Sequence, residues 1–321
     1  MNLHVHKACA FWLFFLWSVS ACAQSSNAID LDRDGIPDQL EQALLEKFRP
    51  TFMIDRLDCD LQPAEFQSGR KEAIVLDRNG TIYGQVFRPS KTERDGVLEL
   101  HYYHLWSRDC GKMGHTLDAE YVASLIHAEH SPDSADDWKA EYWYAAAHEG
   151  TVCDTSSVAR ADALGAENGG ATVWISSGKH GSYFSRQACE RGCGGDRCAN
   201  SLPLEVRKLI NVGEPGAPLN GAEWTSSAKW NLAHKMSNAF SVEVLAAADN
   251  SGSDSVLARR PNTQWQSTIA AMGTSLDAAG LGPQHTSAAL STAKTKTSSA
   301  LALSLRKVRS SLSKAKKATL R

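Results

Sequence analysis

The segment from Asp30 to Glu41 carries side chains with oxygen atoms at alternate positions, and such oxygens can bind a metal ion. The segment fits the pattern D-x-[DN]-x-[DN]-G-x5-E throughout. Ca²⁺ is a hard ion that takes about six to eight oxygen ligands, and alternate side chains of a tight loop can supply them. Gly35 permits the sharp turn that such a loop needs. We therefore predict a Ca²⁺ loop whose ligands are the side chains of Asp30, Asp32, Asp34, Asp38 and Glu41 and the carbonyl of Ile36.

A helix is expected directly after this loop, because Leu40, Leu44 and Phe48 recur at helical spacing. No helix is expected before the loop, so the unit would be half an EF-hand with a structural ion. The alternative is an Asp-rich turn that caps the helix without metal. Five carboxylates held so close together would then repel one another strongly.

A second group of polar side chains lies in the middle of the chain. An aromatic strand is predicted at residues 97–104, a loop follows, and another strand is predicted at residues 120–127. Asp118 and Glu120 are two residues apart and would share one face of a strand. With Asp109 and His115 from the loop they would form an oxygen-rich site suited to Mg²⁺, Ca²⁺ or Mn²⁺. The alternative is a solvated strand face without an ion.

The same stretch resembles the necrosis-inducing protein (NPP1, or Nep1-like) superfamily. The hallmark of that family is a heptapeptide G-H-R-H-D-W-E that follows an acidic loop. The matching positions here are Gly114, His115, Asp118 and Glu120, while Leu117 and Ala119 depart from the pattern. Asp109 matches the acidic residue of the loop. The resemblance implies a divalent cation at these residues.

Residues 177–184 resemble an element of related Vps62-like proteins, and this places Lys179 and His180 near the central site. The resemblance spans about residues 48–184. It implies a β-sandwich that binds a divalent cation at one end and, in the NPP1 family, a role in binding membrane glycosphingolipids and lysing cells.

Eight cysteines are present, and two of them lie in the first 22 residues. The other six predict three disulfides in an exported chain, with the pairing left open. A zinc knuckle is the alternative for the cluster at positions 189, 193 and 198. The disulfide candidates are Cys59, Cys110, Cys153, Cys189, Cys193 and Cys198.

Residues 1–22 have the pattern of an export signal. Lys7 precedes an apolar run at residues 8–19, which is too short to span a bilayer of about 30 Å. Cleavage could follow Ala23. Alternatively, residues 19–22 form a lipobox, and Cys22 would be acylated. We therefore predict either an outer-membrane lipoprotein or a secreted protein.

The body of the chain predicts a mainly β fold, an antiparallel β-sandwich with peripheral helices. A hairpin is expected from residues 72–78 and 81–87 around Asn79-Gly80. Further strands are expected at 141–148 and 171–177, and helices at 204–209 and 226–236. The predicted units are the signal at 1–22, the calcium loop and exit helix at 23–47, the sandwich at 48–274 and a flexible tail at 275–321.

Net charge is −2, so the whole chain does not indicate nucleic-acid binding. The tail is the exception, because the last 37 residues hold nine Lys and Arg and no Asp or Glu. It is predicted to be solvated, with a basic amphipathic helix on an anionic surface as the alternative.

The sequence is compatible with three functions. The first is binding of a glycan, a glycolipid or a membrane surface through the central cation, with membrane damage as its extension. The second is a metal-dependent hydrolase with His115 or His180 as general base. The third is a structural envelope lipoprotein whose ion is the calcium of the N-terminal loop.

Overall fold

The computed structural model describes residues 29–89, 96–111, 114–128, 134–149, 151, 153–193, 195–230, 232–250 and 258–259. The predicted signal with Cys22 and the tail at 275–321 lie outside these residues. Within the described part, no helix is long and apolar enough to cross a membrane.

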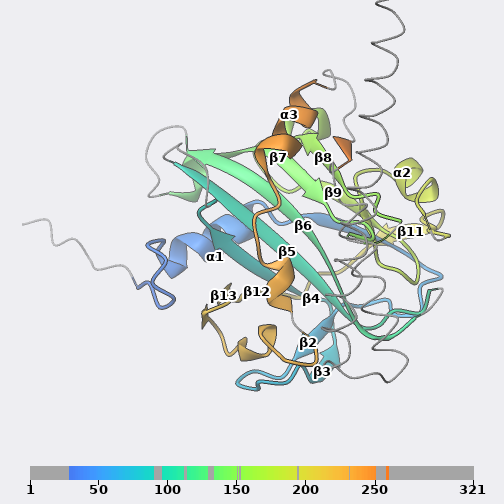
Figure 1. Ribbon diagram of the computed structural model, residues 1–321, viewed down its shortest axis with the longest axis horizontal. Helices are drawn as coiled ribbons and strands as arrows, with labels where there is room; N and C mark the ends of the chain where they lie inside the picture. Colours follow the sequence, from blue (N-terminus) through green and yellow to red (C-terminus); the bar gives the residue numbers. More distant parts are fainter. Residues whose placement is uncertain are drawn as a thin grey trace, which may run out of the picture.

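A sheet of seven strands forms the centre of the molecule (Figure 1). Its two longest strands are neighbours and antiparallel. All pairs in this sheet are antiparallel except β12 with β4, which are parallel. In spatial order the strands are β12 (Lys208–Asn211), β4 (Thr81–Phe87), β5 (Val97–Arg108), β6 (Thr116–Ala128), β7 (Trp138–Ala145), β8 (Ser157–Arg160) and β15 (Ala258–Arg259).

A second sheet packs over part of the first. It consists of β10 (Ser182–Tyr183), β9 (Thr172–Ile175), β1 (Thr51–Asp55) and β11 (Ser201–Pro203), in that order. Two small sheets complete the β structure, β2 (Ala64–Phe66) with β3 (Val75–Arg78), and β13 (Gly213–Glu214) with β14 (Ala217–Pro218). The remaining elements are helices α1 (Asp38–Lys47), α2 (Arg186–Glu190) and α3 (Val242–Asn250) and the short 3₁₀ turns η1 (Ala135–Asp137), η2 (Asp162–Leu164), η3 (Glu223–Thr225) and η4 (Leu232–Lys235).

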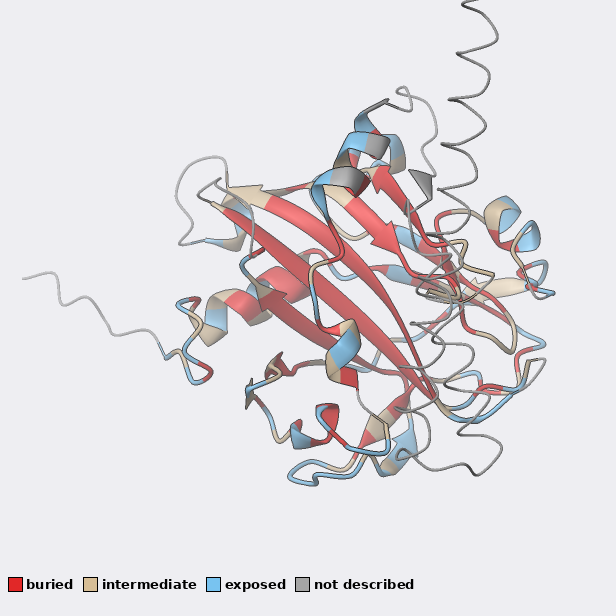
Figure 2. Cartoon of the chain, viewed as in Figure 1, coloured by how far each residue is buried: buried red, intermediate tan, exposed pale blue. Residues whose placement is uncertain are grey.

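Both faces of the central sheet are covered. On one face Tyr102 and Trp106 share a core with Phe52 and Val173 of the second sheet, and Leu45 of α1 packs into the same core. The opposite face packs against the loops that carry η3, η4 and α3. Ten consecutive residues of β5 are therefore buried, and Figure 2 shows the central strands buried along most of their length. Burial on two faces explains why apolar and aromatic residues dominate these strands. A few buried polar side chains, such as Glu99 and Glu120, stand among them.

The predicted mainly β fold is confirmed. The strands expected at 97–104 and 120–127 are present and longer than expected, and the exit helix is α1. The strand expected at 141–148 ends at Ala145, and the one expected at 171–177 is Thr172–Ile175.

The predicted hairpin at Asn79-Gly80 is wrong. Gly80 has a positive φ of 82° and makes the turn. However, β3 pairs with β2, while β4 pairs with β5 and β12. The turn therefore carries the chain from a small sheet into the central sheet.

Neither predicted helix of the second half forms as expected. In the segment expected as a helix at 204–209, residues 208 and 209 belong instead to β12, which pairs in parallel with β4. Among the described residues of 226–236, the helical element is the short η4, and η3 has already ended at Thr225. Pairing with an open sheet edge overrides the local preference at β12.

Three disulfides form, as predicted. They join Cys59 to Cys110, Cys153 to Cys193 and Cys189 to Cys198. The cluster at 189–198 is thus oxidised and is not a zinc knuckle, because a disulfide sulfur is not the thiolate that binds zinc.

Helix α1 is fitted closely onto β4 at Gly84. A Cβ at this position would lie 2.6 Å from a methyl carbon of Leu45, which is fully buried. We expect Gly84→Ala to lower the free energy of unfolding by about 1–3 kcal/mol, because the added methyl overpacks the core. Urea denaturation measures this, with Gly216→Ala as control, since no atom lies within 4 Å of a Cβ there. Equal stability of the two variants would contradict this packing.

Candidate functional site: a buried acidic cluster and an acidic loop

The central site lies where β5 ends and β6 begins. In the register of these strands, Asp118 is opposite Trp106 and Glu120 is opposite His104. Cross-strand partners share a face, so both carboxylates point to the face that carries the second sheet. Both carboxylates are buried. Residues i and i+2 of a strand lie on the same face, so both are buried when that face is covered.

His180 connects Asp118 to an acid that the sequence did not reveal. Its Nδ1 is 2.8 Å from Asp118 Oδ2, and its Nε2 is 3.3 Å from Asp58 Oδ1. The ring stacks on Trp106 with the centroids 4.1 Å apart. Burial disfavours the charged ring, but the hydrogen bonds to the two carboxylates raise the pKa of His180 to about 9. The imidazolium therefore donates to both acids at neutral pH.

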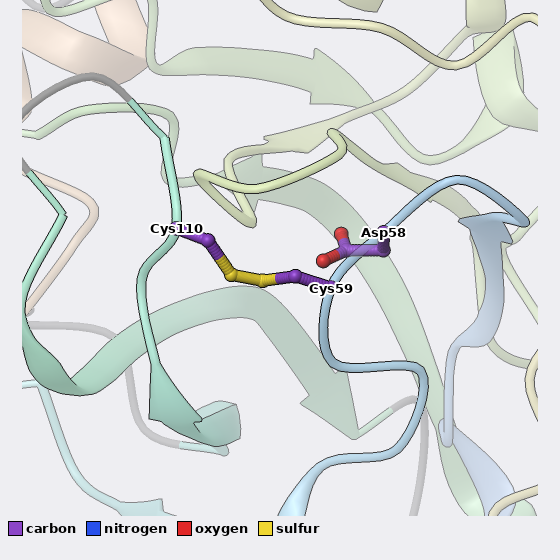
Figure 3. Close-up of side chains that lie close together, drawn as sticks. All are labelled: Asp58, Cys59 and Cys110. Carbon is purple, nitrogen blue, oxygen red and sulfur yellow. A yellow bond between two sulfur atoms is a disulfide. The ribbon is translucent and has the colours of Figure 1, made fainter.

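Asp58 also lies next to a disulfide. Figure 3 shows its carboxylate beside the bridge between Cys59 and Cys110. The three residues have potential metal-binding atoms within 4.8 Å of one another. Two of these atoms are bonded sulfurs, so this group is not a metal site. Asp58 accepts hydrogen bonds from His180 and from the backbone of Gly178, and its role is to position them.

Asp109 is buried at the start of the loop and is paired with Lys179. Its Oδ2 accepts a hydrogen bond from Lys179 Nζ at 2.5 Å, and its Oδ1 accepts one from the backbone of Gly111. His115 is half exposed, and its Nε2 lies 3.5 Å from Asp109 Oδ2. Two predicted site residues, Asp109 and His115, thus face each other, and Lys179 joins them as the sequence indicated.

Glu120 lies beside Lys235, a residue that no sequence motif marked. The Lys235 ammonium donates to the carbonyl of Ala119 and lies 3.8 Å from Glu120 Oε2. That oxygen is buried and has no hydrogen-bond partner. Burial raises the pKa of Glu120 to about 8. For Asp118, burial acts in the same direction, but the hydrogen bond from His180 and the charges of His180, Lys235 and His115 together outweigh it and lower the pKa.

The four predicted ligands occupy one charged region, in which His115 and Lys235 both act on Asp118. Within the described part of the chain, no three of the four bring their ligand atoms within 4.8 Å of one another. Basic side chains pair with the acids instead, namely Lys179 with Asp109, His180 with Asp118 and Lys235 with Glu120. The donor set of three carboxylates and an imidazole fits a hard divalent ion. The region could hold one if the two lysines moved aside.

The N-terminal loop is organised by hydrogen bonds from its own backbone. The two carboxylate oxygens of Asp30 accept from the amides of Arg33 and Gly35, and Asp38 accepts from Leu31. Arg33 and Gly35 have positive φ values of 62° and 85°. The result is a tight turn that brings the carboxylates of Asp30, Asp32 and Asp38 within 4.8 Å of one another.

The inner side of this loop has acidic oxygens without donors. Both oxygens of Asp32, one of Asp34 and one of Glu41 are buried and have no hydrogen-bond partner in the described structure. Burial, reinforced by the neighbouring acids, raises the pKa of Asp32 to about 6 and that of Glu41 to about 9. Buried carboxylate oxygens without hydrogen-bond donors suit Ca²⁺, which takes oxygen ligands.

No family model matches the chain, and no curated protein matches it. Solved structures of the NLP (Nep1-like) group are similar to it. A triple mutant of NLPPya is 17% identical over 61% of this chain and 84% of that chain, with a TM-score of 0.37. The non-toxic HaNLP3 protein is 12% identical over 65% and 96%, with a TM-score of 0.36. NLPPya in complex with glucosamine is 18% identical over 57% and 80%, with a TM-score of 0.32.

These structures belong to the family that the heptapeptide at 114–120 resembles.

We expect His180→Ala to lower the free energy of unfolding by about 3–5 kcal/mol, because it leaves two buried carboxylates, Asp58 and Asp118, without their shared cation. His115→Ala is the matched control. Its side chain is 51% exposed, so its loss should change stability by less than about 0.5 kcal/mol. Denaturant unfolding of both variants measures the difference. A mild effect of His180→Ala would show that the two acids do not depend on the ring.

Proposed function

We propose that this is an exported protein that binds a glycan or a glycolipid head group through a divalent cation at the central site. Asp109, His115, Asp118 and Glu120 would hold the ion. The observation that carries the proposal is the gathering of three buried carboxylates at one end of the sheet. One of them, Glu120, has an oxygen with no hydrogen-bond partner.

The charges of this region make an exchange of cations reasonable. Lys179 pairs with Asp109 and Lys235 with Glu120. Two ammonium groups carry the same charge as one divalent ion, so an ion could replace them without leaving the acids uncompensated. Both lysine side chains are partly exposed, at 21% and 17%.

A bound Mg²⁺, Ca²⁺ or Mn²⁺ would supply coordination positions for sugar hydroxyls or a charged head group, since such ions keep exchangeable waters. His115, which is half exposed, stands at the outer side of the cluster and would contact the ligand. The resemblance of residues 114–120 to the NPP1 heptapeptide supports a sugar-containing ligand. Membrane lysis would be a later step that follows this binding.

Export is supported by the three disulfides, which persist in oxidising compartments. Acylation of Cys22 belongs to the same proposal, because the lipobox lies directly after the apolar run.

The hydrolase alternative gains nothing from His180. A general base must be neutral and within reach of the proton that it removes. His180 is fully buried, and its two hydrogen bonds to carboxylates favour the protonated ring. Its position suits a residue that holds Asp118 in place.

Binding to a glycan array and to glycolipid vesicles tests the proposal. We expect EDTA to abolish binding and added Ca²⁺, Mg²⁺ or Mn²⁺ to restore it. Asp118→Asn should weaken binding about tenfold or more, because it removes a charge from the ion site. Asp77→Asn, at an exposed position of β3, should bind as the wild type does.

The proposal fails if binding continues in EDTA or if folded Asp118→Asn, checked by circular dichroism, binds normally. Leakage of dye from the same vesicles separates binding from lysis.

A further inference from the structure

The acidic loop at residues 30–41 is in contact with a distant part of the chain. Helix α1, which begins within the loop, packs against β12, and β13 follows β12 directly (Figure 1). Gln42 Nε2 donates to the carbonyl of Leu209, and Asn211 Nδ2 donates to Glu41 Oε2 at 2.8 Å. The corner between β12 and β13 is therefore attached to the helix that supplies the last residue of the loop.

Gly213 is the point of closest approach. Its φ of 63° turns the chain, and a Cβ at this position would lie 3.0 Å from Asp32 Oδ2. A side chain here would press against the loop carboxylate, so the backbone of β13 lies directly beside Asp32. The next residue is Glu214, whose carboxylate is close enough to Asp32 and Asp34 for both to act on its charge.

Glu214 also has an oxygen that the protein does not satisfy. Its Oε2 accepts a hydrogen bond from Gln85 Nε2 at 3.2 Å, while its Oε1 is buried and has no partner. The same holds for one oxygen each of Glu41 and Asp34 and for both oxygens of Asp32, whose residue is only 7% exposed. Four carboxylates near the loop, three from residues 30–41 and one from β13, thus have buried oxygens without donors.

Positive charge from the protein hardly reaches this region. Arg88 acts on Asp34 from nearby, but its guanidinium hydrogen-bonds the carbonyl of Gly35. Buried carboxylates without hydrogen-bond donors are costly unless they are paired or bind a metal. This differs from the central site, where three basic side chains pair with the acids.

We propose that Glu214 is an additional Ca²⁺ ligand of the loop at residues 30–41, and that the ion fastens the loop and α1 to the β12–β13 corner. The loop alone offers carboxylates and the carbonyl of Ile36, and Ca²⁺ accepts about six to eight oxygens. Glu214 would add a carboxylate to the inner side of the shell, because Gly213 brings the backbone of β13 directly against Asp32. This inference does not depend on the central site or on its ligand.

Calorimetric titration of EDTA-stripped protein with Ca²⁺ tests the ligand set. The binding event that is lost in Asp32→Asn is assigned to the loop site. We expect Glu214→Gln to weaken that same event about tenfold or more, as loss of a metal-supporting carboxylate does. Glu205→Gln is the matched control, since its side chain is exposed at 72% and pairs only with Arg207. It should bind as tightly as the wild type.

Thermal unfolding with and without Ca²⁺ distinguishes a metal ligand from a residue that only stabilises the fold. Without Ca²⁺, Glu214→Gln should melt at the same temperature as the wild type or higher, because one of several repelling acids has been neutralised. With saturating Ca²⁺ it should melt several degrees lower, because ligand binding stabilises the wild type more.

Two results would overturn the proposal. One is that Glu214→Gln binds Ca²⁺ as the wild type does, or melts lower by the same amount with and without the ion. The other is that Asp32→Asn leaves all Ca²⁺ binding unchanged.

Discussion

Buried negative charge is the constraint on which this structure depends. Carboxylates that leave water need a cation or several donors close by. The chain meets this need in two ways. At the end of the β5–β6 pair, Lys179, His180 and Lys235 pair with the acids. At the N-terminal loop, both oxygens of Asp32 and Oε1 of Glu41 are buried and lack a donor in the described structure. The first region is compensated by the chain itself, and the second calls for an ion from outside.

The central cluster depends on fixed positions of several distant segments. The register of β5 and β6 sets Asp118 opposite Trp106, and Trp106 provides the flat surface on which His180 stacks. Asp58 and Asp109 each precede a half-cystine, and the bridge between Cys59 and Cys110 joins their two loops. A covalent link thus limits the separation of two acids that electrostatic repulsion would drive apart. This arrangement keeps the acids together whether lysines or an ion neutralise them.

Sequence reasoning succeeded where spacing along the chain decides geometry. The loop from Asp30 to Glu41 is contiguous, and the i, i+2 relation of Asp118 and Glu120 follows from the pleat of a strand. It missed Asp58, Lys235 and Glu214, because each reaches its site through tertiary packing from a distant segment without a motif. The Asn79-Gly80 turn shows the same limit. The dipeptide indicates a reversal of the chain, but the choice of partner strand depends on which sheet edge is open.

The two ways of compensating charge also have different consequences for stability and for binding. Because basic side chains neutralise the central acids, that region can stay folded while an ion enters or leaves. Under the proposed function, a divalent cation that displaced the two ammonium groups would change the ligands that the surface binds without changing the fold. At the N-terminal loop Arg88 acts on Asp34, but no basic side chain pairs with Asp32 or Glu41 in the described structure, and the neighbouring acids repel one another. If the central region binds an ion, its own lysines would therefore keep it folded when the ion is absent, whereas the N-terminal loop would depend on its ion.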